Sequence, residues 1–140
     1  MKLQYLLLIM ALLILYSGCK KDTGPDERDA FTGRYEVDEY CDKDSAFYHI
    51  EIVKTGSGNK VEIRGDGLYE TGFVLEALIT GRKLTIPIQQ VEISAVPHIY
   101  FEFSGSGSLS DNYLRIDYQV FTLDEGLITS EDSCTAFCYM

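Results

Sequence analysis

Residues 99–120, IYFEFSGSGSLSDNYLRIDYQV, decide the fold class of this chain. Apolar residues occupy every second position from Ile99 to Phe103, and again from Leu114 to Val120. Alternation with a period of two residues is typical of a strand that buries one face and exposes the other. The sequence Ser-Asp-Asn at residues 110–112 favours a turn between the two runs. The stretch therefore predicts two antiparallel strands joined by a hairpin.

The same alternation continues through most of the chain after residue 30. The inner-facing positions predicted in the other short strands are Phe31, Tyr35 and Val37; Tyr48, Ile50 and Ile52; Val61 and Ile63; Phe73, Leu75, Ala77 and Ile79; Leu84, Ile86 and Ile88; Val91 and Ile93; and Cys134, Ala136 and Cys138. Pro87 indicates a sheet edge or a bulge in one of these runs. No stretch keeps a 3.6-residue apolar period. Because closure removes exposed sheet edges, we expect an all-β fold, a small antiparallel up-and-down barrel or half-barrel of about eight strands.

The first residues carry a different signal, which concerns the destination of the protein. Lys2 is followed by an apolar stretch over residues 3–16 and by Ser-Gly-Cys at residues 17–19. One positive charge, a short apolar stretch and small residues before a cleavage site are typical of a secretory signal peptide. A helix that spans a bilayer needs about 20 apolar residues, which is more than this stretch offers. We therefore predict a signal peptide over residues 1–18.

Residues 15–19, Leu-Tyr-Ser-Gly-Cys, resemble the lipobox of bacterial lipoproteins. In that family the cysteine receives a diacylglycerol, a peptidase cuts before it, and the new amine is often acylated too. The resemblance implies lipid attachment at Cys19, with an ordinary signal peptide and a chance cysteine as the alternative. Several acyl chains on one residue make a stable membrane anchor. Residues 19–30 are polar and are predicted to form a lipidated flexible tether, which leaves residues 31–140 as a single β-barrel domain.

Charge narrows the set of partners. The chain has 22 Asp and Glu against 12 Lys and Arg, for a formal net charge of −10 at pH 7. Such a surface repels phosphate backbones, so nucleic acid is not an expected partner. It also repels anionic lipid, so contact with a membrane is expected through the anchor alone. The predicted location is the cell envelope, on the periplasmic or surface face of a membrane, with the outer membrane favoured.

Three cysteines follow Cys19. An oxidising compartment favours one disulfide among Cys41, Cys134 and Cys138 and leaves one thiol over. Cys41 lies just past the first predicted strand, and Cys134 opens the last strand, which neighbours the first if the sheet closes. We therefore predict the disulfide Cys41–Cys134, with Cys41–Cys138 as the alternative.

Several motifs together resemble a family of small lipocalin-like bacterial lipoproteins, mostly of unknown function. The motifs are Phe31-x-Gly33-x-Tyr35 with Cys41 soon after, Gly81-x-x-Leu84-x-Ile86-Pro87-x-Gln89-x-Val91, Gly105-Ser-Gly-Ser-Leu109, a strand ending in Tyr118, and Cys134-x-Ala136. The resemblance covers nearly the whole chain after the signal peptide. It implies a lipocalin-like barrel with one disulfide; the third cysteine, Cys138, departs from the family pattern.

No motif predicts a named chemistry. His49 and His98 come from separate segments, and the Gly-rich residues 104–108 lack the Gly-Lys-Ser/Thr of a phosphate loop. Asp42, Asp44 and Asp66 lack the spacing of a calcium loop. We therefore predict no enzymatic activity, no catalytic residue, no metal site and no cofactor. The expected function is that of a membrane-anchored accessory or interaction module with an envelope protein as partner. The alternative is a lipocalin-like binder of a small apolar ligand inside the barrel.

Overall fold

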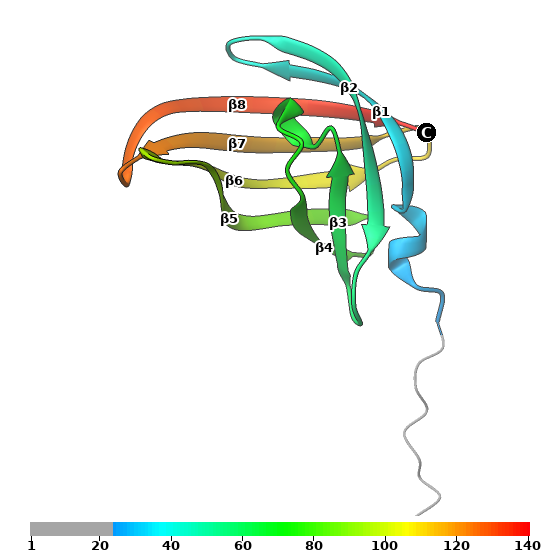
Figure 1. Ribbon diagram of the computed structural model, residues 1–140. Coiled ribbons are helices and arrows are strands. Elements are labelled where there is room, and N and C mark those ends of the chain that lie inside the picture. Colours follow the sequence, from blue (N-terminus) through cyan, green and yellow to red (C-terminus); the bar gives the residue numbers. More distant parts are fainter. Residues whose placement is uncertain (1–23) are drawn as a thin grey trace, which may run out of the picture.

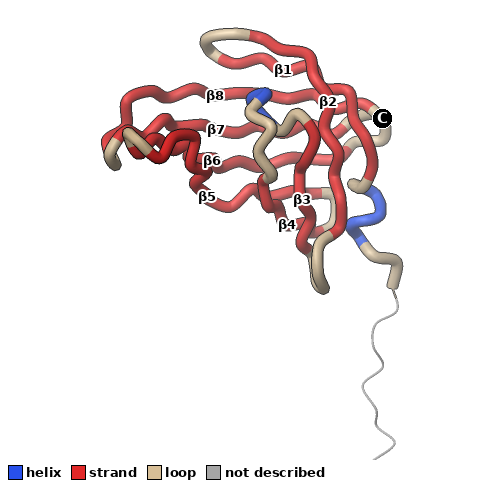
Figure 2. The backbone as a smooth tube through the Cα atoms, viewed as in Figure 1, coloured by secondary structure: helices blue, strands red, loops and turns tan. Residues whose placement is uncertain are grey.

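The computed structural model describes residues 24–140 and shows a closed antiparallel barrel (Figures 1 and 2). Each strand pairs with the next along the chain, and β8 pairs with β1 to close the sheet. The strands are β1 (Gly33–Cys41), β2 (Ser45–Lys54), β3 (Lys60–Gly65), β4 (Leu75–Thr80), β5 (Lys83–Ala95), β6 (His98–Leu109), β7 (Leu114–Asp124) and β8 (Leu127–Tyr139). Two short 3-10 helices, η1 (Glu27–Ala30) and η2 (Leu68–Glu70), complete the described chain. The all-β prediction is confirmed, and the barrel is closed.

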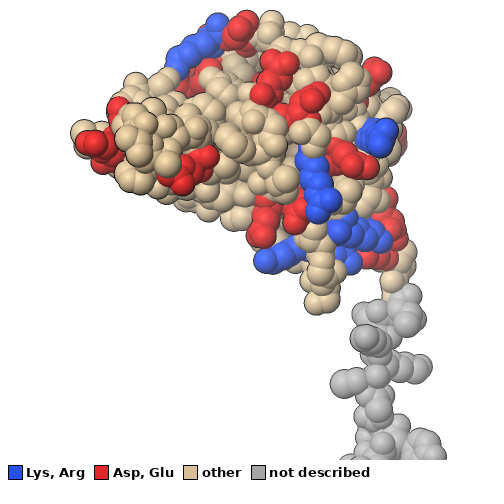
Figure 3. Space-filling view, in the orientation of Figure 1, with Lys and Arg blue, Asp and Glu red and all other residues tan. Residues whose placement is uncertain are grey.

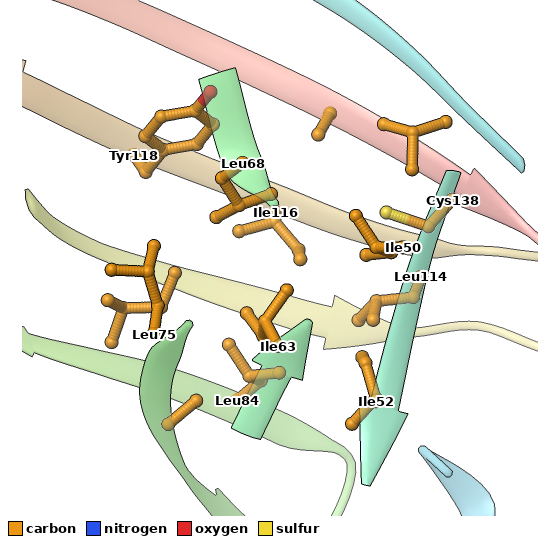
Figure 4. Close-up of a cluster of buried hydrophobic side chains, with 14 of the residues drawn as sticks. Ile50, Ile52, Ile63, Leu68, Leu75, Leu84, Leu114, Ile116, Tyr118 and Cys138 are labelled. Atoms are coloured by element: carbon orange, nitrogen blue, oxygen red, sulfur yellow. The ribbon is translucent and has the colours of Figure 1, made fainter. Parts of the chain in front are cut away.

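The interior of the barrel is filled by its own side chains. Figure 4 shows isoleucine and leucine side chains from several strands converging on one cluster. At one end Phe31, which is fully buried, lies before β1 and accepts a hydrogen bond from Tyr35 Oη at 2.8 Å. At the other end Leu68 of η2, also fully buried, points into the cluster. Full burial of each such side chain stabilises the fold by about 1.5–3 kcal/mol before entropy is counted.

The strands differ in length, and this gives the molecule an open extension. β3 and β4 have 6 residues each, whereas β5 and β8 have 13. Figure 1 shows β5 to β8 running past β3 and β4, so that the β5–β6 and β7–β8 turns lie together beyond the barrel. Val96, at 90% exposure, and Leu127, at 72%, lie at these turns.

The inner-facing predictions hold for most strands and fail on β5. Ile88 is 74% exposed and Ile93 is 39% exposed, although both were predicted to face inward. The β5–β6 register shifts between Ile86 and Gln89, and again between Glu92 and Ser94. An extra residue in one strand sends the following side chains to the opposite face, which explains both errors. The first shift includes Pro87, so the predicted bulge is confirmed.

The start of the described chain is fixed to the barrel. Asp26 caps η1, and Arg28 Nη1 donates hydrogen bonds to Thr55 O at 3.3 Å and Lys60 O at 3.2 Å. Glu27 Oε2 accepts a hydrogen bond from Gly81 N at 2.7 Å. The ordered domain therefore begins before Phe31, inside the segment predicted as a flexible tether.

The signal peptide and Cys19 lie outside the described residues. Within residues 24–140, no helix is both long and apolar enough to cross a bilayer.

A disulfide joins Cys41 to Cys134 across the seam where β1 pairs with β8. The predicted pairing is confirmed, and the alternative Cys41–Cys138 is wrong. Cys138 has a free thiol inside the core, and burial raises the pKa of this thiol to about 12. A thiol with so high a pKa stays protonated and unreactive while the protein is folded.

Candidate functional site

A carboxylate lies at the mouth of the barrel beneath η2. Glu39 follows Tyr35 and Val37 on the inner face of β1 and is only 3% exposed. Its Oε2 atom accepts hydrogen bonds from Tyr48 Oη of β2 and Tyr118 Oη of β7, and a longer one of 3.4 Å from Tyr69 N of η2. A buried carboxylate is costly unless donors surround it, and here three elements supply them.

Asp132 of β8 is a second buried carboxylate near this mouth, at 2% exposure. It accepts hydrogen bonds from Asp42 N at 3.1 Å and from Tyr69 Oη at 2.9 Å. Tyr69 therefore connects both carboxylates, one through its amide and one through its hydroxyl. Its backbone has φ 62°, a left-handed conformation that costs a non-glycine residue energy and persists only where contacts hold it. Tyr69 fastens η2 over the mouth.

The environment of the mouth keeps its three tyrosines protonated, so their hydroxyl groups donate hydrogen bonds and do not transfer protons. Burial, together with the charge of Glu39, raises the pKa values of Tyr48 and Tyr118 well above the ordinary range for tyrosine. Burial and the hydrogen bond to Asp132 raise the pKa of Tyr69 to about 12. All three phenols therefore stay protonated at neutral pH. Every fully buried side-chain polar atom of the described residues has a hydrogen-bond partner.

Glu39, Cys41 and Cys134 place potential metal ligands within 4.8 Å of one another. The two sulfur atoms are joined in the disulfide, however, and thiolates rather than disulfide sulfurs ligate metals. The group therefore has only one carboxylate to offer. A small cavity of about 180 Å³ adjoins the mouth and is lined mainly by polar and charged residues: Glu39, Cys41, Lys43, Asp44, Ser45, Ala46, Tyr69, Glu70 and Asp132.

A larger hollow lies on the outer surface of the barrel. It has a volume of about 630 Å³ and crosses β1, β8, β7 and β6. We call it the outer groove and define it by its lining side chains: Tyr40, Asp42, Ser104, Ser106, Asp117, Gln119, Ser133 and Thr135. These residues alternate along their strands with inward-facing core residues such as Tyr118 and Cys134, so they belong to the solvent face.

The strand register explains why the surface is hollow here. Directly paired residues share a face, so Ser106, Asp117 and Thr135 form a row across the sheet, and Ser104, Gln119 and Ser133 form the next row. The flanking rows carry mostly larger side chains. Ser108, Arg115 and Phe137 lie on one side, and Glu102, Phe121 and Glu131 lie on the other. Two rows of mostly small polar residues between larger ones leave a groove.

Asp117 supplies the charge at the floor of the outer groove. Its Oδ1 accepts hydrogen bonds from Arg115 Nη2 at 2.8 Å, Arg115 Nε at 3.1 Å and Thr135 Oγ1 at 2.7 Å. Partial burial acts in the opposite direction, but these hydrogen bonds keep the pKa of Asp117 below its ordinary value. The carboxylate is therefore ionised at neutral pH, and the bonds that fix it all end on one oxygen.

One aromatic residue, Tyr40, lines the outer groove, and a cluster of three more aromatic rings adjoins it. Tyr40, at 57% exposure, packs edge-on against Phe137 with ring centroids 6.3 Å apart. Phe137 also contacts Tyr113 at 5.8 Å, and Tyr113 contacts Tyr139 at 6.1 Å. Arg115 lies 5.8 Å from the centroid of the Phe137 ring. We call Tyr40, Tyr113, Phe137 and Tyr139 the aromatic border.

Gly105 and Gly107 lie where the backbones of β6 and β7 approach closely. A Cβ atom at Gly105 would lie 2.5 Å from Tyr118 Cβ and 2.6 Å from Asp117 O, and one at Gly107 would lie 2.8 Å from Arg115 O. Both positions lie on the inner face of β6, paired with Tyr118 and Ile116. The glycines let β6 press against β7 beneath the groove, so the Gly-rich stretch shapes the sheet.

The histidines lie on separate elements, and both are exposed. His49 is on β2 with its ring against Phe47, and His98 opens β6 with its Nδ1 3.3 Å from Glu92 Oε1. Asp42 and Asp44 flank the β1–β2 turn, and Asp66 Oδ2 accepts a hydrogen bond from His49 N at 2.9 Å. Neither histidine and none of these aspartates belongs to the one group of potential metal ligands found among residues 24–140.

Sequence reasoning missed Glu39 and Asp132, although a signal was present. Glu39 continues the inner series of Tyr35 and Val37, and Asp132 precedes the inner series of Cys134 and Ala136 with the same spacing. A charged residue in the inner phase of a strand indicates a buried polar group, because the alternation leaves it no solvent-facing position.

Acidic side chains are spread over the face of the molecule seen in Figure 3, whereas basic side chains mostly gather near the start of the described chain. No protein-family model and no curated protein sequence matches the chain. The class of the protein is therefore defined by its fold and its surfaces: a closed, filled β-barrel with a polar groove on the outside.

Proposed function

We propose that this protein is a membrane-anchored lipoprotein of the cell envelope whose barrel is a non-catalytic interaction module that binds through its outer surface. One observation carries the proposal: the barrel interior is filled by core side chains, whereas the open space of about 630 Å³ lies on the outer face. The anchor is supported by the lipobox resemblance that ends at Cys19.

The filled interior also weighs against the alternative function, an apolar ligand held inside the barrel. Small-molecule sites have volumes of about 300–1,000 Å³ and are lined mainly by apolar groups. The cavity at the mouth is about 180 Å³ and includes Glu39, Glu70 and Asp132 in its lining. Most of the aromatic residues that face inward are at most 3% exposed and belong to the core: Phe31, Tyr35, Tyr48, Phe103 and Tyr118. Phe101 is partly buried and packs against them.

Lipid labelling tests the anchor. The wild-type chain should incorporate labelled palmitate and fractionate with membranes, whereas Cys19→Ala should do neither, because the thioether has no attachment atom. Cys138→Ala is the matched control, since it removes a cysteine that the proposal leaves unmodified. Equal labelling of the wild type and Cys19→Ala would contradict the anchor.

Site-specific crosslinking tests the interaction surface. A photo-reactive residue at Gln119, in the outer groove, should give a discrete crosslinked product in intact cells. The same residue at Arg34, an exposed position on β1 outside the groove, should not. Extraction of the purified protein with organic solvent tests the alternative function, because it would release an apolar ligand held inside the barrel. A lipid recovered in equimolar amount, with no crosslink at Gln119, would favour the interior binder instead.

A further inference from the structure

We infer that the outer groove binds a neutral oligosaccharide, laid across the strands from the aromatic border toward β5. This inference rests on the proposed function, because it assigns a ligand class to the surface through which the module is proposed to bind. Four properties of the groove support it: its size, its free hydrogen-bonding groups, the aromatic border and its charge.

The groove has the dimensions of a chain-like ligand. Its central row runs through Tyr40, Thr135, Asp117, Ser106 and Thr85, which lie on five consecutively paired strands. Neighbouring strands are about 4.8 Å apart, so the row spans about 19 Å. A second hollow of about 270 Å³, lined partly by Lys83 and Thr85, shares Ser106 and Asp117 with the first. The two form one continuous path across the sheet.

The floor offers hydrogen-bonding groups that the protein itself does not use. Among the described residues, the side chains of Ser104, Ser106, Gln119 and Ser133 form no hydrogen bond with another protein group. Asp117 Oδ1 takes the bonds from Arg115 and Thr135, which leaves Oδ2 free to accept. A sugar ring presents several hydroxyls that both donate and accept. Hydroxyl, amide and carboxylate groups are the side chains that match such a pattern.

The aromatic border supplies the apolar half of the contact. A sugar ring has one or two faces of C–H groups, which pack on the electron-rich face of an aromatic ring. Tyr40 lines the groove directly, and the residue remains 57% exposed despite the edge-on contact of its ring with Phe137. A ring fixed by a neighbour and open to solvent loses little conformational freedom when a ligand stacks on it.

Charge selects a neutral ligand over an acidic one. Asp42 and Asp117 both line the groove, and its one nearby guanidinium, Arg115, is engaged by Asp117 and lies against Phe137. The other cation, Lys83, lies only at the β5 end of the path, in the lining of the second hollow. The chain as a whole carries a formal charge of −10. Uronic acids, phosphates and sulfates would meet repulsion both locally and at a distance.

Amide chemical shifts of the ¹⁵N-labelled full chain, with the disulfide formed, test the inference. The probes are three neutral trisaccharides, tri-N-acetylglucosamine, cellotriose and maltotriose, with trigalacturonate as the acidic control. Each probe is added to about 10 mM, a concentration at which a ligand with a dissociation constant above roughly 1 mM is still detected. At least one neutral trisaccharide should then shift the amide signals near Ser104–Ser106, Asp117–Gln119 and Ser133–Thr135. A preference for tri-N-acetylglucosamine would indicate an envelope glycan, and a preference for the glucose trimers an exogenous polysaccharide.

Matched variants locate the contact. Tyr40→Ala and Gln119→Ala should each weaken binding at least tenfold, and Ser106→Phe should abolish it by filling the floor. Phe47→Ala is the control, because Phe47 is equally exposed at 59% but lies outside the groove lining. Absence of shifts with every neutral probe, shifts confined to other surfaces, or binding of trigalacturonate alone would overturn the inference. If the oligosaccharide inference failed in this way, a crosslink from Gln119 to a protein in cells would still support the proposed function. Failure of the inference can therefore be told apart from failure of the proposed function.

Discussion

At the scale of single residues, the polar groups of the barrel mouth are organised by Glu39. Three donors from β2, β7 and η2 converge on one oxygen of this buried carboxylate. A group of this kind stabilises the fold only while its partners are present, since removing one leaves part of the desolvation cost uncompensated. The phenols at positions 48 and 118 are therefore structural donors in a hydrophobic core.

Removing the Tyr118 hydroxyl should cost as much stability as a hydrogen bond to a charged acceptor, because it donates to the Glu39 carboxylate. Tyr118→Phe deletes only a hydroxyl that donates to Glu39, and it should lower the free energy of unfolding by about 1.5–3 kcal/mol, the range for hydrogen bonds to charged groups. Tyr35→Phe is the control, because Tyr35 donates to the neutral carbonyl of Phe31, and it should cost about 0.5–1.5 kcal/mol. Urea denaturation at neutral pH measures both values.

A double-mutant cycle identifies the partner. In a Glu39→Gln background the acceptor is neutral, so the cost of Tyr118→Phe should fall toward that of Tyr35→Phe. An unchanged cost in that background would show that the Tyr118 hydroxyl is stabilised by something other than the charge of Glu39.

At the scale of elements, the seam between β1 and β8 closes the barrel. These strands are the first and last of the chain, so their pairing is its longest-range contact, and the disulfide Cys41–Cys134 joins them across a sequence separation of 93. Of all the strand pairings in the sheet, this one closes the longest loop and therefore carries the largest chain-entropy cost. Because the disulfide already joins residues 41 and 134 in the unfolded chain, much of this entropy cost is removed from folding.

Opening the disulfide should therefore cost substantial stability. The double variant Cys41→Ala/Cys134→Ala should lower the free energy of unfolding by about 4–5 kcal/mol in the chain-entropy account. Reductant should lower the stability of the wild type by a similar amount and leave the double variant unchanged, which separates the covalent link from the loss of two side chains. If reductant left the free energy of unfolding of the wild type unchanged in a denaturant titration, the prediction would be contradicted.

The short helix η2 is a second element whose position depends on one side chain. Tyr69→Phe removes the hydroxyl that donates to Asp132 and should release η2 from the mouth while the barrel stays folded. Hydrogen exchange of amides in residues 66–73 should become about tenfold faster, which corresponds to about 1.4 kcal/mol. Tyr113→Phe is the control, because Tyr113 lies on the outer surface away from η2. Equal acceleration in both variants, or none in Tyr69→Phe, would show that Tyr69 does not hold η2.

The elements themselves could largely be predicted from the sequence, because alternation determines both strand position and facing. The run at Ile99, Phe101 and Phe103 and the one from Leu114 to Val120 lie as expected. The predicted inward orientation was wrong for Ile88 and Ile93, which follow or lie in bulges of β5. The alternation of apolar residues does not indicate which face a side chain occupies once an extra residue has been inserted in the strand.

The outer groove could not be predicted, because it depends on the register between strands. Ser106, Asp117 and Thr135 are separated in sequence and become one row only when three strands are aligned. The disulfide was predictable for the opposite reason: a closed meander leaves the first and last strands as neighbours whatever the exact register.

At the scale of the whole molecule, the buried acids that stay protonated make the fold sensitive to alkali. Burial raises the pKa of the Cys138 thiol from an ordinary 9.0 to about 12, and burial with the nearby Cys138 raises that of Tyr35 from 10.0 to about 12. The pKa values of Tyr48 and Tyr118 are raised further. The folded protein therefore holds protons that the unfolded chain releases.

The sign of the effect follows from proton counting. Below pH 9 both states hold these protons, and the stability is complete. Between about pH 9 and 12 the unfolded state binds fewer protons than the folded state, so the free energy of unfolding falls as the pH rises. Urea denaturation at a series of pH values should show this decline, with tyrosinate absorbance appearing together with unfolding. Cys138→Ala should remove the part of the decline that begins near pH 9, and Tyr35→Phe the part that begins near pH 10. A free energy of unfolding that stays constant up to pH 11, or tyrosinate absorbance from buried positions in a chain that is still folded, would show that solvent reaches the interior of the barrel.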